Sequence, residues 1–482
     1  MKKIIAVLLI ICCTATACAL SACSPFEEQI SSYNIYASYD EENSALTGTA
    51  ELNYYNNTEN ELSDLKFNLY GNAFRQDALI KPVSDAYKNR AYYAGESWGG
   101  MEITEVENCA GWEIAGEDEN ILTVTLLTPI YPEETVTVTI SYTLSLAKIN
   151  HRTGVTAHTV NLGNFYPVLC AYSDGGFVEC PYYACGDPFV TECANYSVTL
   201  DLPCEYIAAS SGKAISESEA DGRKKCTYTL ENARDFAFVI SKEFKVLSED
   251  VNGVTVSYYY VSDSNAQTGL NAAVESYKYF CDAFGQYTYP ALSVVQTGFC
   301  YGGMEYPALT MIADGLDSDN TVYTIVHENA HQWWYAMVGS DQINNSWQDE
   351  GLAEYSTLTF FENFPAYGFT RKGIINSATT YYRAFYKVFE QLNGTTDTRM
   401  QRHLSEYSGE LEYNNIAYNK GLVLFDMLRN SVGDEKFAAG LKKYFAENCG
   451  KIASPENLIA CFLGGADVEG LFSSFIEGKI LI

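Results

Sequence analysis

Positive charge and histidine are both scarce in this sequence. It has 30 lysines and arginines against 61 aspartates and glutamates, a formal net charge of −31, and only 5 histidines in 482 residues. Such a surface repels nucleic-acid phosphates and no basic stripe offsets it, so we expect no nucleic-acid partner. A solvated acidic coat explains the excess of acid, and a preference for cationic peptides is the alternative.

Long apolar runs are absent after the N-terminus, so no later segment is expected to span a bilayer. The chain begins M-K-K-I-I-A-V-L-L-I-I, with two lysines before an apolar stretch of signal-peptide length. The stretch ends in L-S-A-C, which resembles a bacterial lipoprotein processing site. The resemblance implies removal of residues 1–22 and a lipid on Cys23, which would anchor the protein to the outer face of a bacterial membrane. A plain secretory signal is the alternative, and both interpretations place the mature protein outside the cytoplasm.

Paired C-x₂-C spacing is also absent, which argues against a structural zinc site among the 15 cysteines. Six cysteines gather between Cys170 and Cys226, and an exported protein is free to form disulfides there. The spacing does not determine which of them would pair.

Strand character dominates the first half of the chain and helical character the second. Period-two stretches of high β-propensity run over residues 121–126, 136–140, 198–202 and 254–258. Helical periods run over residues 272–284, 381–392, 421–429 and 437–447, with a strand at 292–295. This order predicts an N-terminal all-β sandwich or saddle domain over residues 23–262 and a mainly helical domain over residues 263–482.

Two of the five histidines lie in V-H-E-N-A-H-Q-W-W, where His327, Glu328 and His331 form an H-E-x-x-H pattern. Positions i and i+4 share one face of a helix, so both imidazoles can reach one metal ion. Glu350 follows after eighteen residues (332 to 349), and a carboxylate from a second helix would complete a His₂Glu set with one position open for water. The alternative, a core helix with two satisfied histidines, leaves Glu350 unexplained.

The surroundings of the pattern carry two further expectations. Apolar residues on both sides predict one helix that continues to Gly339. Glu354, four residues past Glu350, is expected on a solvated helix face, and a contact behind the metal-binding histidines is the alternative.

A glycine-rich segment, Y-G-G-M-E-Y-P, precedes the metal helix. Gly302 and Gly303 let an extended backbone approach a ligand closely, as at a sheet edge, and Glu305 is placed to face the cleft. A second G-G-M-E ends at Glu102, more than 200 residues before the metal helix. We interpret that copy as strand and turn, with Glu102 exposed.

These motifs, in their order and spacing, resemble the zinc aminopeptidases related to membrane alanyl aminopeptidase and leukotriene hydrolase, which are gluzincin metallopeptidases. The match runs over roughly residues 30–482 and implies a thermolysin-like zinc metallopeptidase fold for the helical domain. It implies one zinc ion held by His327, His331 and Glu350, and hydrolysis of the N-terminal residue from peptides with Glu328 as general base. A zinc endopeptidase, a lipid-epoxide hydrolase on the same scaffold and an inactive surface binding protein are the alternatives.

The resemblance also assigns substrate contacts. It implies substrate binding by Gly302, Gly303, Met304 and Glu305, with the Glu305 carboxylate holding the free amine of the peptide. The segment Y-N-K-G implies that Tyr418 stabilises the transition state. The expected partners are peptides with a free N-terminus and, through the lipid anchor, a membrane; the sequence does not indicate an oligomeric state.

Three features depart from the family pattern. Tyr306 replaces the asparagine of the amine-binding motif, which is expected to weaken the backbone geometry there. Residues 164–188 resemble the region that borders the substrate entrance, but no glutamine or glutamate of the β domain is identified as an amine ligand. The helical C-terminal domain of larger relatives is expected to be absent, which would leave a more open cleft.

Overall fold

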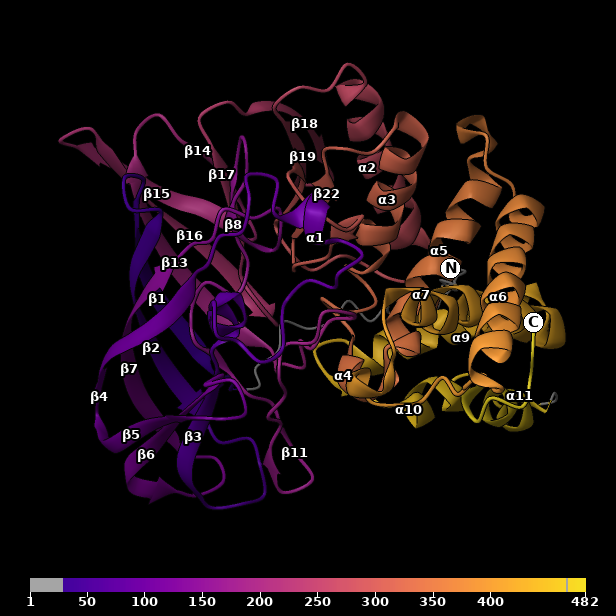
Figure 1. Ribbon diagram of the computed structural model, residues 1–482, viewed down its shortest axis with the longest axis horizontal. Helices are drawn as coiled ribbons and strands as arrows, with labels where there is room; N and C mark the ends of the chain where they lie inside the picture. Colours follow the sequence, from indigo (N-terminus) through magenta and orange to yellow (C-terminus); the bar gives the residue numbers. More distant parts are fainter. Residues whose placement is uncertain (1–28, 465–466) are drawn as a thin grey trace, which may run out of the picture.

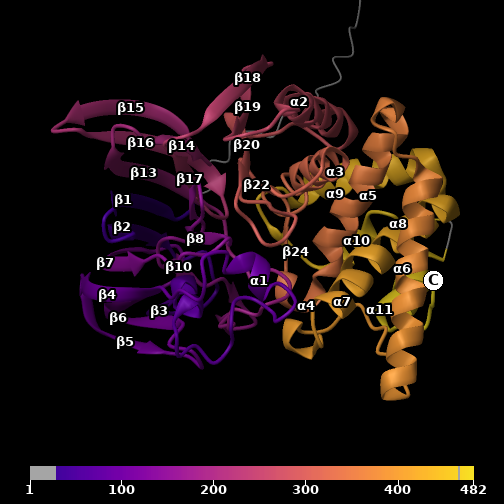
Figure 2. The same cartoon turned by 45° about the horizontal axis from the view of Figure 1, so that its top comes forward.

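The computed structural model describes residues 29–464 and 467–482. The predicted signal peptide and Cys23 therefore lie outside the described residues. Strands gather in one half of the molecule and helices in the other, with a mixed sheet between them (Figures 1 and 2).

Three sheets build the strand-rich half. The largest contains β1 (Ser32–Asp40), β2 (Ala45–Tyr55), β4 (Gly100–Glu107), β7 (Thr135–Ser145), β13 (Ala194–Pro203), β15 (Lys213–Ala220) and β16 (Arg223–Ala233), in the order β15-β16-β13-β1-β2-β7-β4. The second contains β3 (Leu62–Asn68), β5 (Cys109–Ala115), β6 (Ile121–Ile130) and β10 (Val168–Leu169). The third contains β8 (Thr153–Val155), β9 (Val160–Leu162), β14 (Ile207–Ser210) and β17 (Phe238–Ser241). Burial alternates along β1 and β2, as expected for strands with one face in the core.

Helical structure is short in this half. It is limited, within the described residues, to a 3₁₀ turn at Tyr70–Phe74 and the four-residue α1 (Lys88–Ala91). A two-stranded ribbon of β11 (Tyr172–Ser173) and β12 (Gly176–Phe177) completes the half. Glu102 lies exposed on β4, as predicted. No disulfide joins two cysteines of the described residues.

A five-stranded sheet connects the two halves. It contains β18 (Lys245–Val251), β19 (Val254–Tyr260), β20 (Ala291–Thr297), β21 (Gly303–Met304) and β22 (Leu309–Ala313), in the order β18-β19-β20-β22-β21. Strands β18 and β19 thus belong to the sheet of the later half although they precede residue 262. The exact domain boundary stays a prediction.

One helix, α2 (Ala266–Ala283), lies between β19 and β20, and the other helices of this half follow the sheet, which confirms the expected order of a mainly β domain before a mainly helical one. They are α3 (Ser318–Ala330), α4 (Gln342–Asn345), α5 (Trp347–Asn363), α6 (Arg371–Asn393), α7 (Glu410–Tyr413), a π-helix (Asn414–Lys420), α8 (Gly421–Val432), α9 (Asp434–Asn448), α10 (Pro455–Ala460) and α11 (Val468–Ile476). Among these helices lie two short 3₁₀ turns, Pro365–Tyr367 and Leu404–Glu406. A pair of two-residue strands also lies among them, β23 (Gly339–Ser340) and β24 (Ile452–Ala453). Within the described residues, no helix combines the length and apolarity needed to cross a membrane.

Candidate active site

Helix α3 carries the H-E-x-x-H pattern and ends earlier than predicted. It starts at the Asp317 cap, whose side chain accepts a hydrogen bond from Asn320 N, and its last helical residue is Ala330. The prediction of a helix to Gly339 is wrong, because the backbone widens after His331 and Ala336 N donates to His331 O over five residues. His331 keeps helical dihedrals as the C-terminal cap, so the i, i+4 relation to His327 survives.

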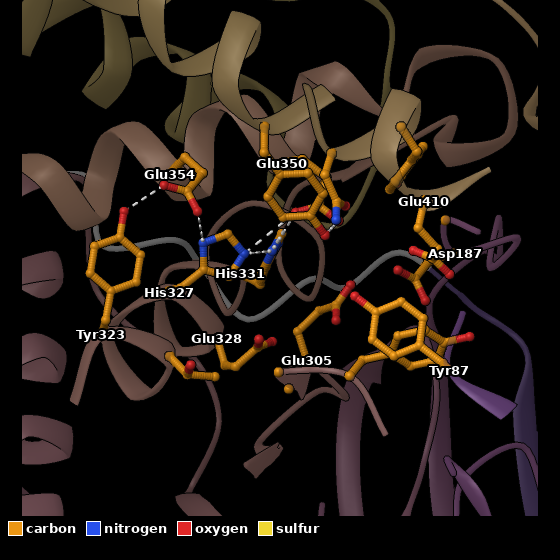
Figure 3. A pocket seen from close by; sticks show the side chains of 18 of the residues that line it. Tyr87, Asp187, Glu305, Tyr323, His327, Glu328, His331, Glu350, Glu354 and Glu410 are labelled. Atoms are coloured by element: carbon orange, nitrogen blue, oxygen red, sulfur yellow. Dashed lines mark hydrogen bonds and ion pairs between the residues drawn. The ribbon is translucent and has the colours of Figure 1, made fainter. Parts of the chain in front are cut away.

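The structure brings the three predicted metal ligands together. His327 Nε2 and His331 Nε2 lie 3.1 Å apart, and Glu350 Oε2 lies 3.4 Å and 3.3 Å from them. All three residues are buried, and their atoms converge on one point in Figure 3. This trio is one of two groups in the described residues able to hold a metal ion, and the other, Glu305 with His331 and Asp349, shares His331 with it.

Outer contacts fix both imidazole rings. His331 Nδ1 lies 3.1 Å from Trp334 O, and His327 Nδ1 lies 3.3 Å from Glu354 Oε1. The Tyr323 hydroxyl donates to the other oxygen of Glu354 at 2.6 Å (Figure 3). The expectation of a solvated Glu354 is therefore wrong, and the alternative of a contact behind the histidines is correct. Such contacts turn Nε2 of each ring toward the metal position.

Helix α5 presents Glu350 from its first turn. The Glu350 N–H donates to Asp349 Oδ1 at 2.8 Å, and Gln342 donates to Asp349 Oδ2 at 2.6 Å. Asp349 thus fixes the start of the helix and brings a further buried carboxyl close to His331. Sequence reasoning missed Asp349, although its place directly before the predicted ligand was a usable signal.

Tyr418 reaches the site from a π-helix, a rare conformation that often marks functional positions. Its hydroxyl donates to Glu350 Oε1 at 2.5 Å, and its ring stacks on His327 with centroids 5.7 Å apart. Close packing of two glycines permits this approach, because a Cβ on Gly421 would lie 2.8 Å from Gly351 Cα. The glycine of Y-N-K-G therefore has a steric reason.

The edge strand β21 forms the floor of the site. Among the described strands it pairs with β22 alone and is therefore the last strand at this edge of the sheet. A Cβ on Gly303 would lie 2.3 Å from Glu328 Oε1, so a larger residue there would displace this carboxylate. Glu305 follows the strand, is only 4% exposed, and lines the cavity with an Oε1 that has no hydrogen-bond partner among the described residues.

Tyr306 is held firmly, in contrast to the expected weakening. Its hydroxyl donates to Asn164 Oδ1 at 2.7 Å, and its carbonyl accepts from Gln332 Nε2 at 3.1 Å. The ring passes over Gly163, where a Cβ would lie 2.0 Å from the hydroxyl oxygen. Tyr306 thereby connects the segment after β21 to the β domain.

The β domain closes one side of a cavity of about 410 Å³, which is also lined by the three predicted metal ligands and by Glu305, Glu328 and Tyr418. Arg152 and Asp187 line it as a buried ion pair, and Arg152 also donates to Tyr182 at 2.5 Å and to Met304 Sδ at 2.9 Å. Burial, together with repulsion from nearby carboxylates, raises the pKa of Asp187 to about 7 despite Arg152. The region 164–188 does border the cavity, but neither of these two residues was identified from the sequence.

The electrostatics of the trio favour a cation. Burial acts to raise the pKa of Glu350, but contacts with His327 and His331 outweigh it and hold the pKa at about 2. Burial acts to lower the pKa of His331, but Glu305 and Glu350 outweigh it and raise the pKa to about 10. Burial raises the pKa of Glu328 to about 8, with Glu305 adding to the rise. Glu350 is thus ionised, and Glu328 is able to exchange a proton near neutral pH.

Sequence comparison finds a family match. Residues 268–475 match the model of the Peptidase family M1 domain. Aminopeptidase M1-D of Oryza sativa subsp. japonica is 25% identical over 311 residues, which cover 59% of this chain and 34% of the relative. Endoplasmic reticulum aminopeptidase 2 of Homo sapiens is 24% identical over 319 residues, which cover 58% of this chain and 30% of the relative. The chain spans about a third of the length of these curated relatives.

Comparison of solved structures supports the same fold. The M1 zinc metallopeptidase from Deinococcus radiodurans aligns with a TM-score of 0.65 at 18% identity, covering 94% of each chain. A mutant of that protein bound to a Tyr-Ser-Ala substrate aligns with a TM-score of 0.62 at 17% identity, covering 94% of this chain and 95% of that one. The likeness extends over both halves of the molecule and establishes the fold.

Proposed function

We propose, since residues 268–475 match the model of the Peptidase family M1 domain, that this chain is a zinc-dependent aminopeptidase that removes the N-terminal residue from peptides. The observation that carries the proposal is the convergence of His327, His331 and Glu350 beside Glu328 and Glu305 in one cavity. Relatives named aminopeptidases and a structural neighbour bound to a peptide substrate support it.

The donor set fits zinc. Tetrahedral zinc with bonds of about 2.0–2.2 Å places neighbouring donor atoms about 3.3 Å apart, and His327, His331 and Glu350 have separations of 3.1, 3.3 and 3.4 Å. Glu350 Oε2 has no hydrogen-bond partner among the described residues, as a metal-binding oxygen should. Zinc, when bound, supplies the Lewis acidity that polarises a scissile carbonyl and acidifies a water molecule.

Glu328 and Tyr418 would perform the proton transfer and the charge stabilisation. Glu328, buried beside the histidines, would accept a proton from the attacking water and deliver it to the leaving amine. The Tyr418 hydroxyl lies next to the metal ligand Glu350 and would donate a hydrogen bond to the developing oxyanion. Burial and the Glu350 charge raise the pKa of Tyr418 well above its ordinary value, so the hydroxyl keeps its proton.

Glu305 and the edge strand β21 would position the peptide. The unpartnered Glu305 carboxylate would pair with the substrate ammonium and set the cleavage one residue into the chain. Gly302, Gly303 and Met304 would offer their backbone to the substrate as an added strand. An anion at this position distinguishes a free N-terminus from a blocked one.

The test is turnover of an aminoacyl-anilide panel by zinc-loaded protein, with and without chelator. Glu328→Gln should retain zinc and lose turnover by about 10²–10⁴-fold, whereas Glu390→Gln on the exposed face of α6 should retain both. Wild-type turnover in Glu328→Gln would contradict the assigned base. Equal cleavage of N-acetylated and free peptides would favour an endopeptidase. Turnover of a lipid epoxide without turnover of any peptide would favour an epoxide hydrolase. No turnover of any substrate would favour a binding protein.

We also propose export with lipidation at Cys23, which rests on the sequence pattern alone. Metabolic labelling with a fatty acid should mark the wild-type chain in a bacterial host. Label retained in Cys23→Ala would contradict the assigned site.

A further inference from the structure

Three carboxylate oxygens are buried without a hydrogen-bond partner among the described residues: Glu305 Oε1, Glu350 Oε2 and Glu410 Oε1. All three residues line the same cavity. A buried anionic oxygen without a partner is unfavourable and requires a counter-charge. Glu350 faces the proposed metal and Glu305 the proposed ammonium, so Glu410 is the carboxylate whose counter-charge is unassigned.

Glu410 does not serve the start of α7. Two residues on, Glu412 accepts hydrogen bonds from the Ser408 hydroxyl at 2.7 Å and from Ser408 N at 2.8 Å, and it pairs with Arg402 Nη1 at 2.8 Å. Glu412 therefore both caps this turn and is neutralised. Glu410 makes no ion pair with any described residue, although it is the first residue of the same helix.

The arginines of the cavity are engaged elsewhere. Arg152 is ion-paired with Asp187, and Arg90 lies over the Tyr87 ring at 5.6 Å from its centroid. Neither forms an ion pair with Glu410 in the described part of the chain. Glu410 therefore has no ion-pair partner among the described residues of the cavity.

Burial raises the pKa of Glu410 to about 7, and the attraction of Arg152 and a contact with Tyr301 only partly oppose it. The Tyr301 hydroxyl is itself used in a hydrogen bond to Ala184 O at 3.0 Å. A cation next to Glu410 would offset the free-energy cost of burying the ionised carboxylate. Aromatic rings of Tyr87, Tyr301 and Tyr413 line the approach, which suits a side chain with an apolar stem and a charged head.

The position of Glu410 assigns it to one residue of the substrate. In Figure 3, Glu328 lies on one side of Glu305, and Glu410 lies with Asp187 and Tyr87 on the other. In the proposed mechanism Glu328 delivers its proton to the leaving amine, so the part of the peptide after the cleaved bond lies on the same side of Glu305 as Glu328. The side chain of the N-terminal residue, whose ammonium is at Glu305, is then directed to the Glu410 side.

We infer that Glu410 closes the side-chain pocket for the substrate's N-terminal residue and selects lysine or arginine there. The inference rests on the proposed aminopeptidase function for the orientation of the substrate. It adds a second charge contact to the one between Glu305 and the α-ammonium.

The test compares lysine with norleucine, which has the same stem without the ε-ammonium. Zinc-loaded wild-type protein should cleave lysyl 4-nitroanilide with a kcat/KM about tenfold to a hundredfold above that of norleucyl 4-nitroanilide. Glu410→Gln should reduce this ratio toward one, and Glu390→Gln, which changes the same group on an exposed helix face, should leave it unchanged. A wild-type ratio at or below one, or an unchanged ratio in Glu410→Gln, would overturn the inference.

Calorimetric binding of L-lysinamide and L-norleucinamide to the same zinc-loaded proteins separates the two proposals. Tighter binding of lysinamide to wild type but not to Glu410→Gln supports the charge pocket even where no anilide is cleaved, which would refute only the proposed activity. Equal affinity of wild type for the two amides overturns the pocket while anilide turnover leaves the activity standing. A Glu410→Gln protein that fails to fold still leaves both wild-type comparisons decisive.

Discussion

Gly303 lies so close to Glu328 that a Cβ on the glycine would be 2.3 Å from the Glu328 carboxylate oxygen. The Glu328 carboxylate thus occupies the space that a side chain at position 303 would fill. Its position depends on glycine at that point of the edge strand. Gly302 has no such role, because a Cβ there would lie 3.9 Å from the nearest atom, on Thr324.

We predict that Gly303→Ala lowers kcat/KM by on the order of a hundredfold, because the Glu328 carboxylate must move from its working position. The clash involves the end of a side chain, so the fold should remain intact. Anilide turnover and thermal unfolding of the same preparation would measure both effects.

Gly302→Ala is the matched control, with the same chemical change one residue earlier. It should retain activity within a few-fold of wild type. Equal losses in the two variants would show that the strand needs flexibility there and would contradict the steric fit of Gly303 to Glu328.

A second prediction concerns the contact between Glu354 and His327. Glu354→Gln should weaken zinc binding by about 10- to 100-fold, because the carboxylate no longer fixes the imidazole and raises its basicity. Competition with a chromophoric chelator measures this directly. Tyr323→Phe removes only the hydroxyl that donates to Glu354 at 2.6 Å and should cause a smaller loss. Wild-type affinity in Glu354→Gln would contradict the assigned contact.

The metal ligands could be predicted from sequence because their geometry is mostly local. The i, i+4 spacing of His327 and His331 fixes their shared face in any helix, and a third ligand on a following helix needs only a short connection. The end of α3 could not be predicted in the same way. Apolar residues continue to Val338, but the Trp333 indole donates to Gly285 O, a tertiary contact that periodicity does not contain.

The remaining cavity groups depend on long-range packing. The sequence pattern of α5 is compatible with an exposed Glu354, and its inward orientation depends on contacts with Tyr323 and His327 of α3. Asp187 and Glu410 come from segments more than 200 residues apart that meet at the cavity through the fold of both halves. Polar residues in irregular segments carry no period, so their convergence is visible only in three dimensions.

A third prediction concerns the link between the halves of the molecule. Tyr306→Phe should lower the free energy of unfolding by about 1–3 kcal/mol, because it leaves the buried side-chain oxygen Oδ1 of Asn164 without its hydrogen-bond donor. Tyr335→Phe is the matched control, since the buried Tyr335 hydroxyl has no hydrogen-bond partner among the described residues. Urea denaturation should show a loss in the first variant and almost none in the second. Equal stability of the two variants would contradict a stabilising Tyr306–Asn164 bond.

A fourth prediction follows from the titration of Glu410, whose pKa burial raises to about 7. In the free enzyme the carboxyl is neutral below this value and ionised above it, so the lysine-to-norleucine ratio of kcat/KM should rise with pH. The expected rise is about tenfold between pH 6 and 8, where kcat/KM reports free-enzyme ionisations. Ionisation of Glu328 or the metal site affects both substrates equally and cancels in the ratio. The ratio should be flat with pH in Glu410→Gln, and a rise of equal size in that variant would assign the titration to another group.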